Sequence, residues 1–151
     1  MVTLFQHPQQ ASLLAGQPEL LPNAVNELLR HSRLLTSVPP RVATQDVPLG
    51  DTVVRAGEAV FPLIAVANRD PDVFPDPHRF DVTRNGPAPH VAFGHGAHYC
   101  LGANLAKLEL QIALGSLLER FPALAPAVNL ADLEWKPGLF MRALRTLPVT
   151  W

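Results

Sequence analysis

The sequence has little cysteine, no excess of charge of either sign and no long hydrophobic run. Its single cysteine, Cys100, among 151 residues cannot form an internal disulfide, so a reducing cytoplasm is the expected environment. Twelve basic and thirteen acidic side chains give a net charge of −1, which argues against nucleic acid as a partner. No apolar stretch reaches the roughly 18 residues that a spanning helix needs, so no membrane partner is expected.

Aromatic side chains are also few, at 7%, yet 48% of the residues are hydrophobic and 17% are charged. This is the composition of a folded domain and not of a disordered tail. Sixteen prolines are about twice the usual frequency. Because proline ends helices and interrupts central strands, regular structure is expected in the stretches without it: 23–38, 49–61 and 90–121. Five prolines between Pro71 and Pro89 predict a winding loop, fixed to the core by Phe74 and Phe80.

Hydrophobic periodicity and turn residues predict a mainly helical fold with small β-sheets, of the α+β class. Asn23 is expected to cap the second of three helices, and the helices are predicted over residues 8–15, 23–35 and 101–120. The last helix should be buried on several sides, because its apolar residues go most of the way around it. Short strands are expected over 41–47, 52–55 and 59–64, with a β-rich tail over 134–151.

One loop, residues 93–102, combines glycines with the only cysteine. Gly94 and Gly96 permit a tight turn with positive φ. Cys100 follows at the entrance of the long predicted helix, where unpaired backbone N–H groups favour an anionic sulfur, and a thiolate is a ligand for soft metal ions. Gly102 leaves room for a flat group. Taken alone, Cys100 also fits a small buried hydrophobic residue, and the two glycines also fit a phosphate-binding loop.

The whole run, F-x-x-G-x-x-x-C-x-G, resembles the haem-binding loop of the cytochrome P-450 family, the haem-thiolate monooxygenases. Soluble bacterial members often carry F-G-x-G-x-H-x-C-L-G, and every one of these positions is filled here. The resemblance implies that Cys100 is the axial ligand of the iron in haem b and that His98 hydrogen-bonds a haem propionate. It also implies that four residues shape the proximal pocket: Phe93, Gly94, Gly96 and Gly102.

Three further segments resemble the family in their order and spacing. Glu27 and Arg30 form its E-x-x-R pattern, and the i, i+3 spacing brings the two side chains close enough to pair on one helix face. A solvated surface pair is the alternative for any such pattern. By resemblance, Arg79 completes a structural triad with this pair, and Arg41 meets the second haem propionate. For Arg41 the alternative is an ordinary surface arginine on an edge strand.

The resemblance begins far into the family pattern. Residues 1–151 are therefore expected to be the proximal, haem-ligating C-terminal part of one cytochrome P-450 domain, without the distal half and the oxygen-activating helix. The implied activity inserts one oxygen atom of O2 into a small organic substrate, with electrons from a ferredoxin and its reductase or from another donor. Residues 37–39 and 139–141 are candidates for facing that substrate. The alternative is a non-catalytic haem-binding fragment or an inactive remnant that lacks the distal pocket.

Overall fold

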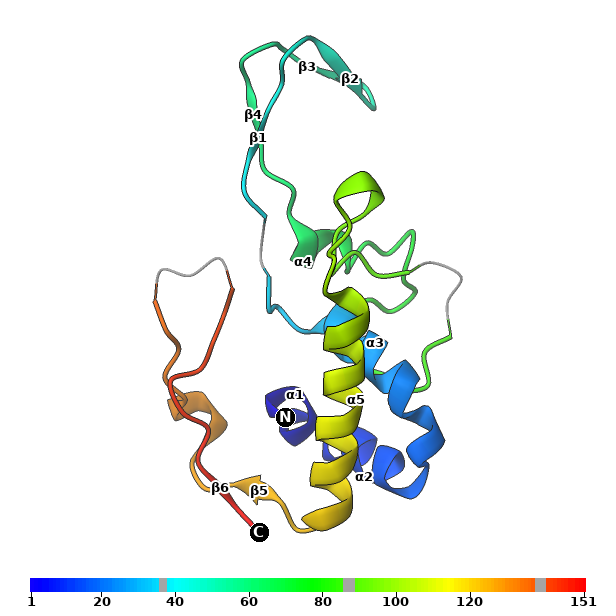
Figure 1. The fold of residues 1–151 in the computed structure, drawn as a ribbon, viewed down its shortest axis with the longest axis vertical. Helices are drawn as coiled ribbons and strands as arrows, with labels where there is room; N and C mark the ends of the chain where they lie inside the picture. Colours follow the sequence, from blue (N-terminus) through cyan, green and yellow to red (C-terminus); the bar gives the residue numbers. More distant parts are fainter. Residues whose placement is uncertain (36–37, 86–88, 138–140) are drawn as a thin grey trace.

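The computed structural model describes residues 1–35, 38–85, 89–137 and 141–151, and it confirms the predicted α+β class (Figure 1). The helices are α1 (Val2–Gln6), α2 (Pro8–Gly16), α3 (Leu21–His31), α4 (Ile64–Ala67) and α5 (Ala103–Arg120). The 3₁₀ turns are η1 (Pro18–Leu20), η2 (Gly96–His98) and η3 (Leu130–Asp132). The strands are β1 (Arg41–Val42), β2 (Val47–Leu49), β3 (Thr52–Val54), β4 (Ala59–Val60), β5 (Ala125–Pro126) and β6 (Val149–Thr150).

The core forms where α1, α2, α3 and the loop after α4 meet one side of α5 (Figure 1). Its buried members are apolar side chains from all of these segments: Leu4, Leu14, Ala24, Val25, Leu29, Phe80, Val82 and Leu114. Gly115 lets α3 and α5 approach each other closely, because a Cβ at this position would lie 3.0 Å from Cδ2 of Leu21. Phe74 and Phe80 are both buried, which confirms that they fix the proline-rich loop to the core.

The strands form three separate two-stranded antiparallel sheets. In β1 and β4 Arg41 lies opposite Val60, and in β2 and β3 Val47 lies opposite Val54. These two pairs make a narrow ribbon that projects from the helices (Figure 1). The third pair, β5 and β6, lies beside the far end of α5. None of the helices that the structure describes is both long enough and apolar enough to cross a membrane.

Helix α3 differs from the predicted helix over residues 23–35 at both ends. Asn23 lies inside the helix and does not cap it, because its side-chain amide donates to the carbonyl oxygens of Val82 and Arg84, at 2.7 and 3.1 Å. The helix stops before Ser32, whose backbone is extended with ψ of 143°. Asn23 therefore joins the helix to the proline-rich loop, a role that local helix signals do not reveal.

The long helix predicted over residues 101–120 forms as α5, but the prediction that it is buried on several sides is wrong. Within α5 only Ala103 and Leu114 are buried. Leu101 is fully exposed, and the next three residues on the same side of the helix are 52–61% exposed. We call this set the apolar stripe of α5: Leu101, Leu105, Leu108 and Ile112.

The small β tail predicted over 134–151 contains β6, which pairs with β5 upstream of the tail. Among the described residues the tail also forms two isolated bridges, Leu35 with Met141 and Trp135 with Leu144. The first bridge connects the tail to the segment that follows α3. Of the two predicted substrate-facing segments, residues 37, 139 and 140 lie outside the described residues.

Candidate functional site

The cysteine loop, residues 91–102, is held by main-chain hydrogen bonds. The Gly94 N–H donates to the Val91 carbonyl, and the Cys100 N–H donates to the Phe93 carbonyl, each at 2.9 Å. Between these bonds, Gly94 and Gly96 have φ of 76° and 75°. Left-handed values of this kind cost a residue with a Cβ about 1–2 kcal/mol. The two glycines thus allow the turn that the sequence predicted, and the turn fixes where Cys100 is presented.

Cys100 lies two residues before Gly102, which is the N-cap of α5, and the cysteine is exposed. Its carbonyl accepts the Ala103 N–H at 3.2 Å and so joins the loop to the helix. Gly102 faces open space, since no atom lies within 4 Å of where its Cβ would be. Leu101 stands between them and begins the apolar stripe. An exposed thiol next to an open glycine and an apolar surface suits contact with a flat hydrophobic group.

A metal at Cys100 needs ligands that the described residues do not supply. In that part of the chain, no group of three or more His, Cys, Asp or Glu side chains could hold a metal ion. A haem would need only one ligand from the protein, because the macrocycle supplies donors of its own, and Cys100 could provide that ligand as a thiolate. The exposed Cys100 and the open, apolar surface beside it therefore fit a haem better than a metal ion held by protein side chains alone.

Five of the other residues predicted to contact haem share the loop with Cys100: Phe93, Gly94, Gly96, His98 and Gly102. Phe93 is half-buried, packs against the core and has the Tyr99 ring 6.4 Å from its own centroid. His98 is exposed at the end of η2. Arg41 is exposed on β1, in the ribbon. Neither His98 nor Arg41 forms a salt bridge within the described ranges.

The E-x-x-R pair is a buried ion pair and not a surface one. Glu27 and Arg30 are each 2% exposed. The carboxylate of Glu27 accepts from Nε and Nη2 of Arg30 at 2.7 and 2.8 Å, a two-point contact. The remaining donors of Arg30 reach main-chain carbonyls of Asn68, Pro77 and Arg79, at 2.9, 2.9 and 3.2 Å. All the polar atoms of this guanidinium thus have partners, which is what a buried charge requires.

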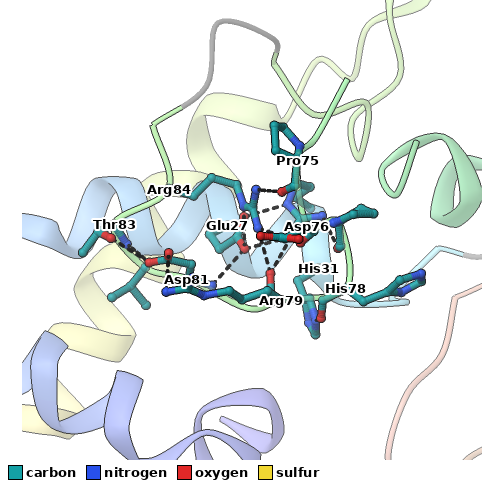
Figure 2. A network of polar contacts seen from close by, with 12 residues as sticks. Glu27, His31, Pro75, Asp76, His78, Arg79, Asp81, Thr83 and Arg84 are labelled. Atoms are coloured by element: carbon teal, nitrogen blue, oxygen red, sulfur yellow. Dashed lines mark hydrogen bonds and ion pairs between the residues drawn. The ribbon is translucent and has the colours of Figure 1, made fainter. Parts of the chain in front are cut away.

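The second arginine at Glu27 is Arg84, and not the predicted Arg79 (Figure 2). Nε of Arg84 lies 3.3 Å from Oε1 of Glu27, and its side chain is 15% exposed. The Arg79 side chain is 65% exposed and pairs with Asp81 at 3.3 Å. Arg79 enters the network through its main chain, because its carbonyl accepts from both Arg30 and Arg84. No local signal distinguishes Arg84 in the sequence, because its contact with Glu27 spans 57 positions of the chain.

Asn68 is a buried residue that sequence reasoning missed. It is 2% exposed, and its main-chain carbonyl accepts from Arg30 at 2.9 Å. Its side-chain Oδ1 accepts the Val91 N–H at 2.8 Å, at the start of the cysteine loop. Asn68 therefore connects the buried ion pair to the loop that carries Cys100.

Comparison with known proteins agrees with this geometry. The family model for cytochrome P-450 matches residues 13–147. The chain is 46% identical over 153 residues to the biotin biosynthesis cytochrome P-450 of Bacillus subtilis (strain 168), covering 100% of this chain and 37% of that protein. It is 49% identical over 149 residues to nocardicin C N-oxygenase of Nocardia uniformis subsp. tsuyamanensis, covering 98% and 37%.

A solved structure gives the same result. The crystal structure of the LnmA cytochrome P-450 hydroxylase from Streptomyces atroolivaceus S-140 matches with a TM-score of 0.92 and 53% identity, covering 99% of this chain and 38% of that one. The chain thus spans little more than a third of the length of these relatives. Since the family model covers most of the sequence and the fold agrees over nearly all of it, the chain belongs to the cytochrome P-450 family.

Proposed function

We propose that this chain carries the haem-ligating part of a bacterial cytochrome P-450 monooxygenase, with the Cys100 thiolate as the axial ligand of the iron of haem b. The observation that carries the proposal is the exposure of Cys100 at the start of α5, on a loop turned by two left-handed glycines. A buried cysteine, the alternative from sequence alone, has no access to a cofactor. In this proposal residues 1–151 are one unit, the proximal part of a larger domain.

The residues of the site would bind and orient the cofactor. Cys100 holds the iron, and Phe93 shields the sulfur from water. The exposed His98 and Arg41 offer N–H donors to the two propionates, since hydrogen bonds to an ionised carboxylate are the stronger kind. When bound, a thiolate-ligated haem supplies the activation of O2 that lets one oxygen atom enter a small organic substrate. A ferredoxin with its reductase, or another donor in a reducing cytoplasm, would supply the electrons.

The test is spectroscopic and does not depend on turnover. The purified chain is loaded with haemin, reduced with dithionite and exposed to carbon monoxide. Thiolate ligation is expected to give a strongly red-shifted Soret band, and Cys100→Ser should abolish it. Tyr99→Phe is the matched control, because it alters the exposed neighbour of the cysteine and should leave the band unchanged. The ligand assignment is wrong if Cys100→Ser gives the same spectrum as the unmodified chain.

A second candidate is haem binding without coupled turnover. The observation that favours it is the apolar stripe of α5, which is exposed in a chain that spans 37% of the length of its relatives. In this candidate Cys100 and the stripe would hold the haem, and the electrons of NADPH would appear in peroxide formed from O2 and not in a hydroxylated product. With NADPH, ferredoxin reductase and ferredoxin present, peroxide formed in equal amount to NADPH consumed would support this candidate. A hydroxylated product accounting for the NADPH would exclude it.

A further inference from the structure

A hollow of about 650 Å³ lies between α1, the C-terminal end of α3 and the tail that follows η3. No residue of the cysteine loop lines it. The charged side chains in its wall are the guanidinium groups of Arg33, Arg69 and Arg142, accompanied by the rings of His31 and Trp135. Met1 also lines the hollow, and burial lowers the pKa of its amino group. Three separate segments of the chain thus contribute one arginine each to the same hollow.

These three arginines have no carboxylate partner in the ranges that the structure describes, where the salt bridges all belong to other arginines. No Asp or Glu lines the hollow, and residues 36–37, 86–88 and 138–140, which lie outside those ranges, include no acidic residue. The carboxylate whose charge acts on Arg69 is that of Glu27. Both of its oxygens already accept hydrogen bonds from Arg30.

Arg69 is fixed in this wall by main-chain acceptors. Its Nη1 donates to the carbonyl of Ala65 at 3.1 Å, and its Nη2 donates to the carbonyl of His31. Partial burial and repulsion by Arg33 and Arg30 lower the pKa of Arg69 below its ordinary value. The fold therefore holds positive charge at an electrostatic cost that a bound anion would relieve.

Arg142, which also lines the hollow, is held by stacking. Its guanidinium carbon lies 4.1 Å from the centroid of the Trp135 ring, a cation–π contact that fixes the plane of the fork. Its main-chain N–H donates to the Leu34 carbonyl at 2.8 Å, which ties this part of the tail to the segment after α3. Arg33 lies in that segment, and its side chain is exposed and forms no hydrogen bond in the part of the chain that the structure describes.

We propose that this hollow is a binding site for an oxyanion: the phosphate or carboxylate group of a small organic anion. Guanidinium groups match both oxyanions in geometry and charge. Two of the three arginines are already oriented, so a bound oxyanion needs to order only Arg33. The site is independent of the proposed haem function, because none of its residues lies in the cysteine loop.

The test uses the fluorescence of Trp135 in the full chain. Trp151→Phe removes the second of the two tryptophans and serves as the background. Potassium phosphate and potassium succinate are titrated separately, with potassium chloride at equal ionic strength as the reference. We expect a saturable fluorescence change and a higher melting temperature with phosphate, with succinate or with both. Phosphate alone would assign the site to phosphate groups, and a response to succinate would include carboxylates.

Three variants localise the binding. Arg33→Gln and Arg142→Gln should each weaken it about tenfold or more, since each removes a charged hydrogen-bond donor. Arg55→Gln is the matched control, because Arg55 lies in the ribbon and pairs with Asp46; its affinity should be unchanged. The melting temperature gives a second readout for Arg142→Gln, which also alters the surroundings of Trp135. The proposal is overturned if neither anion exceeds the chloride response, or if the three variants bind alike.

The haem proposal and the oxyanion proposal can be tested separately, because each has a variant that should affect only one of them. Cys100→Ser should bind phosphate or succinate as the unmodified chain does, even though it loses the thiolate spectrum. Conversely, Arg33→Gln should keep that spectrum. A loss of anion binding in Cys100→Ser with unchanged circular dichroism would contradict the independence of the hollow.

Discussion

Replacing Glu27 by glutamine removes a buried negative charge while keeping the size of the side chain. Four donors approach its oxygens: Nε and Nη2 of Arg30 at 2.7 and 2.8 Å, the Asp81 N–H at 3.1 Å and Nε of Arg84 at 3.3 Å. A glutamine offers one oxygen and turns an amide group toward a guanidinium. Removing one partner of a buried ion pair costs about 3–5 kcal/mol, because the other charge stays buried. We expect Glu27→Gln to lower the free energy of unfolding by this amount.

The assay is urea denaturation of the full chain, followed by far-ultraviolet circular dichroism. A domain is usually stable by only about 5–15 kcal/mol, so the variant should be largely or wholly unfolded at moderate urea. Glu119→Gln removes the same charge at the exposed end of α5 and should change stability by about 0.5 kcal/mol or less. A loss below about 1 kcal/mol for Glu27→Gln would refute the reasoning, because that is the value of a surface pair.

The same titrations separate the two arginines near Glu27. Arg84→Gln should cost about 1.5–3 kcal/mol, the value of hydrogen bonds to a charged group, because this side chain contacts the buried carboxylate. Arg79→Gln should cost about 0.5 kcal/mol or less, because its side chain is 65% exposed. Equal losses for the two variants would contradict the assignment of Arg84 as the second arginine at Glu27.

Acidification from about pH 7.5 to about pH 5.5 should destabilise the chain, because burial lowers the pKa of His31 and His90 below the ordinary value of 6.5. A histidine with a lowered folded-state pKa binds protons more readily in the unfolded chain. Its contribution to the free energy of unfolding is therefore complete above about pH 6.5 and is lost as the pH falls below that value. In urea titrations, His90→Gln should reduce the loss of stability between the two pH values, and greater stability at the lower pH would disprove the idea. Gly94→Ala should lower the free energy of unfolding by about 1–2 kcal/mol, because φ at this residue is 76°. Gly102 faces open space, so Gly102→Ala should lower it by less than about 1 kcal/mol in the same urea titrations. The reverse order would show that the left-handed turn does not constrain the loop.

The sequence predicted the helices and turns better than it predicted which side chains those elements bury. Pro8 and Gly16 bound α2 much as predicted, because proline and glycine act through their own backbone. The Glu27–Arg30 spacing predicted a pair on one helix face. It did not predict burial, because the partners that bury the pair come from residues 38 to 57 positions away. The resemblance pointed to Arg79 and did not single out Arg84, since the path of the loop decides which guanidinium reaches Glu27.

The cysteine loop was the most predictable part of the site, because its turn depends on glycines within the motif itself. Arg41 was less accessible to prediction, since its relation to the loop depends on how the ribbon leaves the helices. The exposure of the apolar stripe of α5 could not be predicted from its pattern. Apolar spacing shows which side of a helix can be buried, but it does not show whether another segment of this chain packs against that side. Asn68 carried no signal, because its two contacts are with segments far along the chain.

The direction of the contacts made by α3 has a consequence for protein synthesis. The main partners of its buried charges come later in the chain, from Asn68 to Arg84. On the ribosome, α3 therefore emerges with Glu27 and Arg30 still in water, and it can bury them only after residue 84 has been made. Asn68 also holds the start of the cysteine loop, so the Cys100 loop docks onto a residue that these buried charges contact as well. The residues that enclose these charges are all made before Cys100, so this part of the core can begin to close before the proposed ligand has left the ribosome.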